Sequence, residues 1–143
     1  MVNCSFGSNT SVPYGNSQFS TVHSHVVMAH CSIAQNFLPR ADQGYDADGY
    51  CLLANNVFAQ IEWRGSEDAD LAVTHNHFFA GGLQPALAKH SSSGGDETTL
   101  FADASNGDFT PGGDLLASLK KPVVQYDRAG TLRPTNSPAG ALA

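Results

Sequence analysis

Three stretches of this chain read AHCSIAQNF at residues 29–37, GYCLLANNV at 49–57 and ADLAVTHNH at 69–77, so one pattern returns every twenty residues. In each copy a small residue is followed, at alternate positions, by two apolar residues, and an Asn stands three positions after the second apolar residue. A fourth copy, VNCSFGSN at residues 2–9, precedes the first by twenty-seven residues. The Asn residues of the four copies are Asn9, Asn36, Asn56 and Asn76.

This period predicts a stack of parallel β-strands. Twenty residues are too few for a two-helix repeat, and the Leu pattern of leucine-rich repeats is absent. Alternation with a period of two is typical of a strand with one buried face. Equivalent residues of stacked strands lie about 4.8 Å apart, so one Asn side chain can hydrogen-bond to the next. We predict an all-β fold, a right-handed parallel β-helix (solenoid) of about four to five rungs with an Asn ladder; a β-sandwich with coincidental spacing is the alternative.

Length and charge limit the other possibilities. A chain of 143 residues is one domain by default, and we place the rungs in residues 1–98 and a closing rung with a C-terminal tail in residues 99–143. A net charge of −6 with only seven Lys and Arg residues argues against nucleic acid as a partner. No apolar run approaches the roughly 18 residues that a membrane span needs. No signal-peptide pattern is visible at Met1.

The first copy of the pattern begins at Val2, so the sequence shows no cap for the first rung. An uncovered solenoid end exposes both core side chains and unpaired backbone groups. We therefore expect a homo-oligomer that forms through the uncapped N-terminal rung, unless the chain is the C-terminal part of a longer helix. The repeat also places Cys4, Cys31 and Cys51 in one interior column, where we expect reduced thiols because parallel side chains disfavour the disulfide dihedral angle.

The C-terminal part carries a family resemblance. The segments LFADASNGDF at residues 100–109, YDRAGTLRP at 126–134 and PAGA at 138–141 resemble the closing segment of the pectate-lyase-like superfamily of right-handed parallel β-helix proteins, in their carboxy-terminal portion. The resemblance implies the fold more specifically than a function. Proteins of this superfamily often bind or cleave acidic polysaccharides and are mostly secreted, so the compartment of this chain stays open. The apolar segment 122–124 is a candidate strand or cover over the last rung.

Outward-facing strand positions are the candidate ligand site. His30, Tyr50 and Asp70 follow one another in one predicted outward column, and an aromatic and polar mixture of this kind suits a glycan. A second column contains His75, a candidate base near a basic side chain. The nearby basic candidates are Arg64 and Lys89. The alternative is that all six are ordinary solvated strand positions.

Residue type and spacing suggest two candidate metal sites. Asp42, Asp46 and Asp48 precede a Gly, as carboxylates do in calcium loops, but the spacing is not that of an EF-hand and no Glu closes the loop. His23, His25 and His30 invite a zinc interpretation, although the sequence places no third ligand with the first two. No cofactor is expected apart from calcium as a hypothesis for the acidic loop, for which a solvated loop is the alternative.

Three functions of different classes follow from these observations. The first is a non-catalytic β-helix module that self-associates, with carbohydrate as a candidate ligand. The second is a polysaccharide lyase or glycoside hydrolase that acts on an acidic polysaccharide, which requires an acid, a base and a charge-neutralising group or a carboxylate pair. Neither set can be assigned by motif. The third is a structural fragment of a larger surface or phage-type protein.

Overall fold

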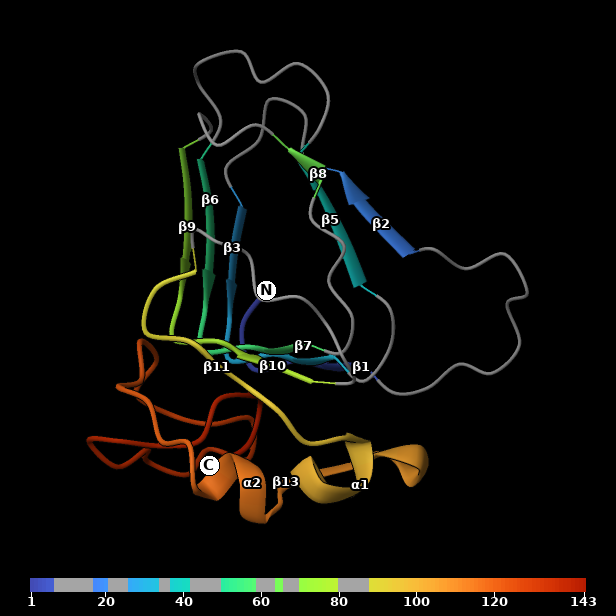
Figure 1. The fold of residues 1–143 in the computed structure, drawn as a ribbon. Helices are drawn as coiled ribbons and strands as arrows, with labels where there is room; N and C mark the ends of the chain where they lie inside the picture. Colours follow the sequence, from blue (N-terminus) through green and yellow to red (C-terminus); the bar gives the residue numbers. More distant parts are fainter. Residues whose placement is uncertain are drawn as a thin grey trace.

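The computed structural model describes residues 1–6, 17–20, 26–33, 37–41, 50–58, 64–65, 70–79 and 88–143. Its repeats form three parallel sheets (Figure 1). Sheet 1 consists of β3 (Val26–Ala29), β6 (Tyr50–Ala54) and β9 (Asp70–Thr74). Sheet 2 consists of β1 (Ser5–Phe6), β4 (Ser32–Ile33), β7 (Val57–Phe58), β10 (His77–Phe78) and β11 (Ser92–Ser93). Sheet 3 consists of β2 (Ser17–Ser20), β5 (Phe37–Ala41) and β8 (Arg64–Gly65).

The spacing between paired strands changes along the stack. Strands β6 and β9 pair with the predicted offset of twenty residues, and β1 pairs with β4 at the predicted twenty-seven. Between β3 and β6 the offset is twenty-five, because Met28 lies opposite Leu53. Between β10 and β11 it falls to fifteen, with His77 opposite Ser92.

The sequence alignment of residues 29–37 with residues 49–57 is therefore wrong by five residues. Ile33 lies opposite Phe58, where the alignment had placed it opposite Leu53. Cys51 lies opposite Val26, so it is not in the column of Cys4 and Cys31. The physical reason is burial: the register places fully buried Met28 beside Leu53, which is also in the core, and the segments between strands absorb the change in length.

The middle strands of sheet 2, β7 and β10, are buried on both faces, as is usual for parallel sheets. On the inner face of the sheet Phe58 and Phe78 stack with their ring centroids 5.9 Å apart, within a core shared with sheet 1. The other members of this core are Met28, Cys31, Leu53 and Val73. On the outer face Val57 packs into a second core that the C-terminal part of the chain supplies. The residues of the second core are Val57, Phe79, Leu100, Phe101, Ala104, Phe109, Leu115 and Ala139.

The C-terminal part begins with a compact set of short elements. They are α1 (Glu97–Leu100), β12 (Phe101–Asp103), a 3-10 helix (Ala104–Asn106), β13 (Asp108–Pro111) and α2 (Gly113–Leu116). Asp96 caps α1 by accepting the backbone N–H groups of Thr98 and Thr99. Strands β12 and β13 pair antiparallel. Among the described helices, each of the two α-helices has four residues, and no helix is long and apolar enough to cross a membrane.

Residues 118–143, which we call the tail strap, lie along the outer face of sheet 2 (Figure 1). The Ser118 and Ser92 hydroxyls are 2.6 Å apart at the last rung, and Asn3 donates its side-chain N–H to the Tyr126 carbonyl at the first rung, 2.8 Å away. The strap therefore runs back beside the rungs. The expectation that residues 122–124 cover the last rung is wrong, because Val123 bonds to His30 and Asn55 in the middle of the stack.

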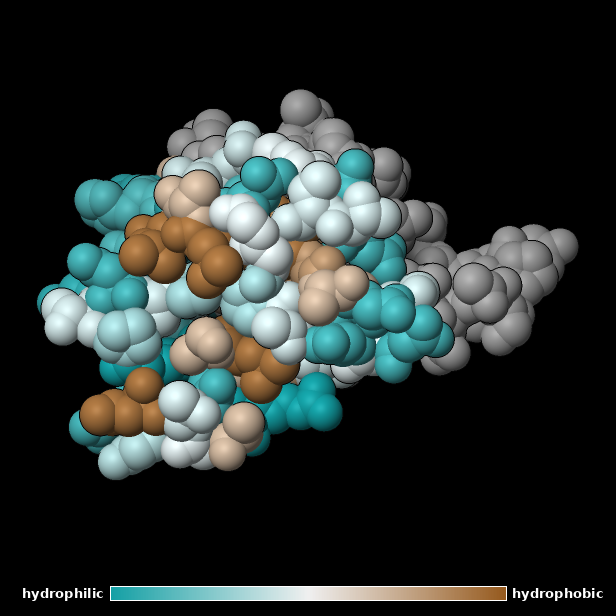
Figure 2. All heavy atoms as spheres, turned by 90° about the horizontal axis from the view of Figure 1, so that it is seen from below, coloured by the Kyte–Doolittle hydropathy of each residue, from teal (hydrophilic) through white to brown (hydrophobic). Residues whose placement is uncertain are grey.

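Figure 2 looks onto the C-terminal part of the chain, where apolar side chains stand in several separate patches among polar ones. The exposed large apolar residues of this part are Leu116, Leu119, Val123, Tyr126 and Leu132. The C-terminal part of the chain thus buries Val57 and its neighbours without making a uniformly polar outer surface.

Gly140 is a point where the strap and sheet 2 meet without room for a side chain. Its φ is +100°, and a Cβ atom would lie 2.5 Å from the Ser32 hydroxyl oxygen. We expect Gly140→Ala to lower the free energy of unfolding by about 2–4 kcal/mol, measured by urea denaturation. Gly130→Ala is the matched control, since Gly130 also has a positive φ (+84°) but has open space around it. Equal losses in the two variants would contradict close packing at Gly140.

Candidate functional site

Five residues at the turns between sheet 1 and sheet 2 have left-handed backbone conformations. Their φ angles lie between 52° and 56°. They are Asn3, His30, Asn55, His75 and His90, and we call them the turn column. Asn and His are both found in this conformation more often than most other non-glycine residues. The column therefore sets side chains with hydrogen-bonding groups one above another along one edge of the stack.

The residue after each turn-column residue faces inward and forms a ladder. The Asn56 Oδ1 accepts the Cys31 backbone N–H at 2.9 Å, and the Asn76 Oδ1 accepts the Asn56 backbone N–H at 2.8 Å. The Asn56 side chain also donates to the Asn76 Oδ1 at 3.1 Å. Ser91 continues the column by accepting the Asn76 N–H at 3.2 Å. The residue beside Asn56 is thus Cys31, whereas the predicted ladder members Asn9 and Asn36 lie outside the described residues.

His30 is fully buried beneath the tail strap. Its Nε2 accepts the Val123 backbone N–H at 3.2 Å, so the ring proton resides on Nδ1, which has no hydrogen-bond partner. Burial, and then the positive charge of Arg133, lower the pKa of His30 to about 3; the Gly140 carbonyl acts weakly in the opposite direction. His30 is therefore a neutral structural residue near pH 7 and is not accessible to a ligand.

The last two turn-column residues are more open. The His75 and His90 rings stack with their centroids 5.0 Å apart. The His75 Nδ1 lies 2.7 Å from the Thr74 hydroxyl. Partial burial, and then the positive charges of His90 and two lysines, lower the pKa of His75.

His77 follows on the other side of the turn and is nearly buried. Its Nε2 lies 2.9 Å from the Gly94 carbonyl, to which it donates, and its Nδ1 therefore accepts the Ser92 hydroxyl at 2.8 Å. Burial lowers the pKa of His77, which is thus held in one neutral tautomer.

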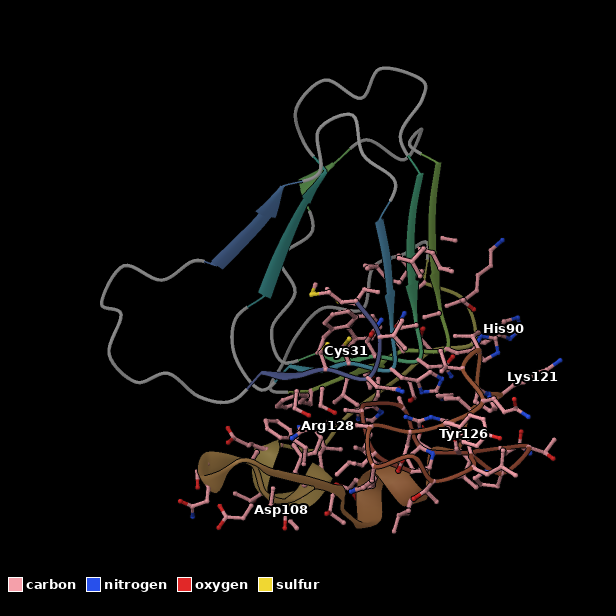
Figure 3. All side chains as sticks on the ribbon, turned by 180° about the vertical axis from the view of Figure 1, so that it is seen from behind. Cys31, His90, Asp108, Lys121, Tyr126 and Arg128 are labelled. Atoms are coloured by element: carbon pink, nitrogen blue, oxygen red, sulfur yellow. The ribbon has the colours of Figure 1, made fainter. Side chains whose placement is uncertain are left out.

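Two lysines of the tail strap are fixed by their backbone beside the turn column. Lys120 exchanges two backbone hydrogen bonds with Ser137, both 2.8 Å long. The Lys121 carbonyl accepts the Asn55 side-chain N–H at 2.9 Å. Figure 3 shows Lys121 and His90 at the same edge of the molecule. A group of basic side chains thus gathers where the strap crosses the turn column.

Asp127 and Arg133 hold the strap in its folded path through hydrogen bonds within the strap. Asp127 accepts the Thr131 N–H at 2.7 Å and the Ala143 N–H at 3.1 Å. Buried Arg133 donates to the Gly140 and Ala141 carbonyls at 2.9 and 3.0 Å. The Ala141 N–H in turn donates to the Ser32 hydroxyl on sheet 2. These polar residues therefore have a structural role, since they shape the strap and fix it to the rungs.

The six predicted ligand residues fall in separate places. Tyr50 and Asp70 lie opposite each other at the start of β6 and β9, five residues before the turn column, which is about 16 Å along an extended strand. Arg64 lies in sheet 3, opposite Arg40. Tyr50 and Asp70 do lie opposite each other. The prediction that these two share an outward column with His30 is wrong, because the altered offset places His30 in the column of Asn55 and His75.

His75 and Lys89 are the two predicted residues that the structure brings together. The His75 N–H donates to the Lys89 carbonyl at 2.9 Å, and Lys89 is followed by His90. Sequence reasoning missed His90, Lys120 and Lys121. A twenty-residue repeat does not predict the offset of fifteen residues that places His90 in the turn column, nor the path of the strap that places the two lysines beside it. A signal that could have found the column is Asn or His followed by Cys, Asn or Ser, which recurs at residues 3, 30, 55, 75 and 90.

The proposed calcium residues Asp42, Asp46 and Asp48, and the histidines His23 and His25, lie outside the described residues. Within the part of the chain that the structure describes, no group of three or more His, Cys, Asp or Glu side chains is placed to hold a metal ion. Cys4 and Cys31 are free thiols, and burial raises the pKa of Cys31 to about 11, so its reactive thiolate is disfavoured near pH 7.

The chain was compared with protein-family models, with curated proteins and with solved structures, and none of the three comparisons finds a match. The functional argument therefore depends on the residues and contacts of this chain.

Proposed function

We propose that this chain is a non-catalytic parallel β-helix module that associates with another copy of itself through the edge of its first rung. The strand pairing supports the solenoid part of the proposal, because in each sheet strands from successive repeats pair in parallel. The tail strap is compatible with it, since within the described residues the strap bonds to the first rung through the Asn3 side chain, and no strap hydrogen bond to the backbone of β1 is found there.

The observation that carries the proposal is that exposed apolar side chains lie beside an edge strand at the first rung. Strand β1 is the edge strand of sheet 2 and has β4 as its one partner there among the described strands. Met1 and Val2 run beside β3, and their side chains are 45% and 46% exposed. Val27, on β3, is 44% exposed. Exposed apolar residues beside an unpaired strand edge favour strand addition by another chain.

The acidic residues of the tail support a non-catalytic role. Hydroxyl and backbone N–H donors lower the pKa values of Asp96 and Asp108, and the Asn106 side-chain amide and then the Ser105 hydroxyl lower that of Asp103. Bonds from backbone N–H groups outweigh burial in lowering the pKa of Asp127. A general acid works best with a pKa near the pH of reaction. These carboxylates are therefore suited to ending helices and turns.

The molar mass in solution tests the proposal directly. We expect light scattering behind a sizing column to give a dimer or a larger closed species for the natural sequence. Val2→Lys should shift the protein to the 15.0 kDa monomer, because like charges would face each other across a shared edge. Leu116→Lys is the matched control, since Leu116 is similarly exposed (52%) but lies in α2, and it should leave the mass unchanged.

A monodisperse monomer of the natural sequence at all accessible concentrations would overturn self-association. An oligomer that persists in Val2→Lys would mean that another surface joins the copies.

A further inference from the structure

We propose that His75, His90, Lys120 and Lys121 form an anion-binding site, which takes an oxyanion group such as sulfate or phosphate where the tail strap crosses the last rungs. This site lies at the opposite end of the stack from the self-association edge and does not depend on it. Its chemistry follows from four nitrogen-bearing side chains that three separate segments of the chain bring together.

Backbone contacts fix the positions of all four residues. His75 and His90 belong to adjacent rungs, which are joined by the 2.9 Å bond from the His75 N–H to the Lys89 carbonyl. The strap holds Lys121 through Asn55, the turn-column residue directly before His75, and Lys120 through its paired bonds with Ser137. The backbone positions of the four residues are therefore set before any ligand arrives, so binding has to order only their side chains.

The charge around the site is concentrated and positive. The chain has three lysines, Lys89, Lys120 and Lys121, and all of them lie at this edge although the net charge is −6. The charges that lower the pKa of His75 all come from cations, namely His90, Lys120 and Lys121. Across the turn, His77 lies in the field of Lys120 and of Asp114. Grouping these cations is unfavourable without an anion, so a bound oxyanion would relieve their repulsion.

A metal ion fits this site less well. Two stacked imidazoles supply two of the four ligands that zinc prefers, and the lysines beside them repel a cation. An oxyanion instead accepts hydrogen bonds from lysine ammonium groups and from protonated imidazoles. Because protonation supplies a donor, binding should strengthen as the pH falls and His75, whose pKa lies below its ordinary value in the free protein, gains a proton.

The test is calorimetric titration with sodium sulfate and, separately, sodium phosphate, at pH 6.0 and pH 7.5, with sodium chloride keeping the ionic strength constant. We expect sulfate to bind about tenfold more tightly at pH 6.0, and sulfate at pH 6.0 to shift the ring NMR signal of His75 toward its protonated position. Phosphate and sulfate should both bind if the site recognises oxyanions in general. Chloride should not displace sulfate at equal ionic strength.

Variants separate the proposed site from general attraction. The double variant Lys120→Gln, Lys121→Gln should weaken sulfate binding about tenfold. The control Arg128→Gln removes another exposed cation of the strap and should change it less than twofold. His75→Asn with His90→Asn should abolish the pH dependence, and Asn suits these positions because Asn3 and Asn55 occupy the same column. Circular dichroism checks that each variant is folded.

Three results would overturn the proposal: no sulfate binding by the natural sequence at pH 6.0, equal weakening by Arg128→Gln and the double lysine variant, or a pH dependence that survives in the double histidine variant. The mass of the protein in solution is measured separately, so failure here is distinguishable from failure of self-association.

Discussion

Replacing Asn76 by Ala is expected to lower the free energy of unfolding by about 2–6 kcal/mol, a large share of the 5–15 kcal/mol typical of a domain. Two buried backbone groups would lose their partners. The Asn56 N–H would lose the Asn76 Oδ1, 2.8 Å away, and the Leu53 carbonyl would lose the Asn76 Nδ2, 2.9 Å away. Each buried group left without a partner costs about 1–3 kcal/mol. Urea denaturation followed by circular dichroism measures the change.

Asn106→Ala is the matched control for this substitution. Asn106 makes a 2.7 Å side-chain bond to the Asp103 carboxylate, but both residues are exposed, so water can replace the lost bond. We expect a loss below about 1 kcal/mol there. The double variant Asn56→Ala, Asn76→Ala should lose less than the sum of the single variants, because the two side chains share a bond. A small, additive effect at Asn76 would show that the ladder contributes little to stability.

The repeat in the sequence was sufficient to predict parallel strand pairing and an Asn stack, but not the register of every rung. Asn56 and Asn76 are joined by the expected bonds, and Leu53 lies opposite Val73 as the twenty-residue period requires. The misalignment arose at Ile33, because several apolar residues stand within a few positions there and only burial of Met28 selects the true register. Register depends on which residues fill the core, and a pattern of small and apolar residues leaves neighbouring choices open.

The candidate site was even less accessible from the sequence. His75 and Lys89 were identified as candidates, whereas His90, Lys120 and Lys121 join them only through the change in offset and the path of the strap. Those contacts depend on hydrogen bonds to backbone groups of the strap, such as the bond from the Asn55 side chain to the Lys121 carbonyl. Because every residue type has a backbone carbonyl, such a bond leaves no pattern in the strap's sequence. Gly140 and Arg133 lie in the C-terminal segments quoted above, but nothing in the sequence indicated their contacts. Gly140 packs against the Ser32 side chain of sheet 2, and Arg133 donates to the Gly140 and Ala141 carbonyls of the strap.

Acid is expected to destabilise this protein at pH values above those at which its carboxylates titrate. The pKa of His30 is lowered from 6.5 to about 3 in the folded chain, so the unfolded chain binds a proton that the folded chain excludes. The stabilising effect of neutral His30 is therefore complete above pH 6.5 and is lost as the pH falls from 6.5 toward 3. Over this window it amounts to roughly 5 kcal/mol. Burial lowers the pKa values of His75 and His77 as well, and both add losses of the same sign.

The measurement is the free energy of unfolding in urea at pH 7.0, 6.0, 5.0 and 4.5, and His30→Asn should remove most of the slope. Asn suits the left-handed backbone of position 30, and Asn55 Oδ1 still accepts the Val123 N–H at 3.2 Å when the imidazole is gone. Gly107→Ala, which changes a positive-φ glycine (+84°) in open space, is a control that lowers stability without removing a titrating group, so its slope should match that of the natural sequence. A neutral native His30 requires proton uptake on unfolding throughout this pH range. A flat profile for the natural sequence, or an unchanged slope in His30→Asn, would therefore mean that the buried imidazole does not couple folding to pH.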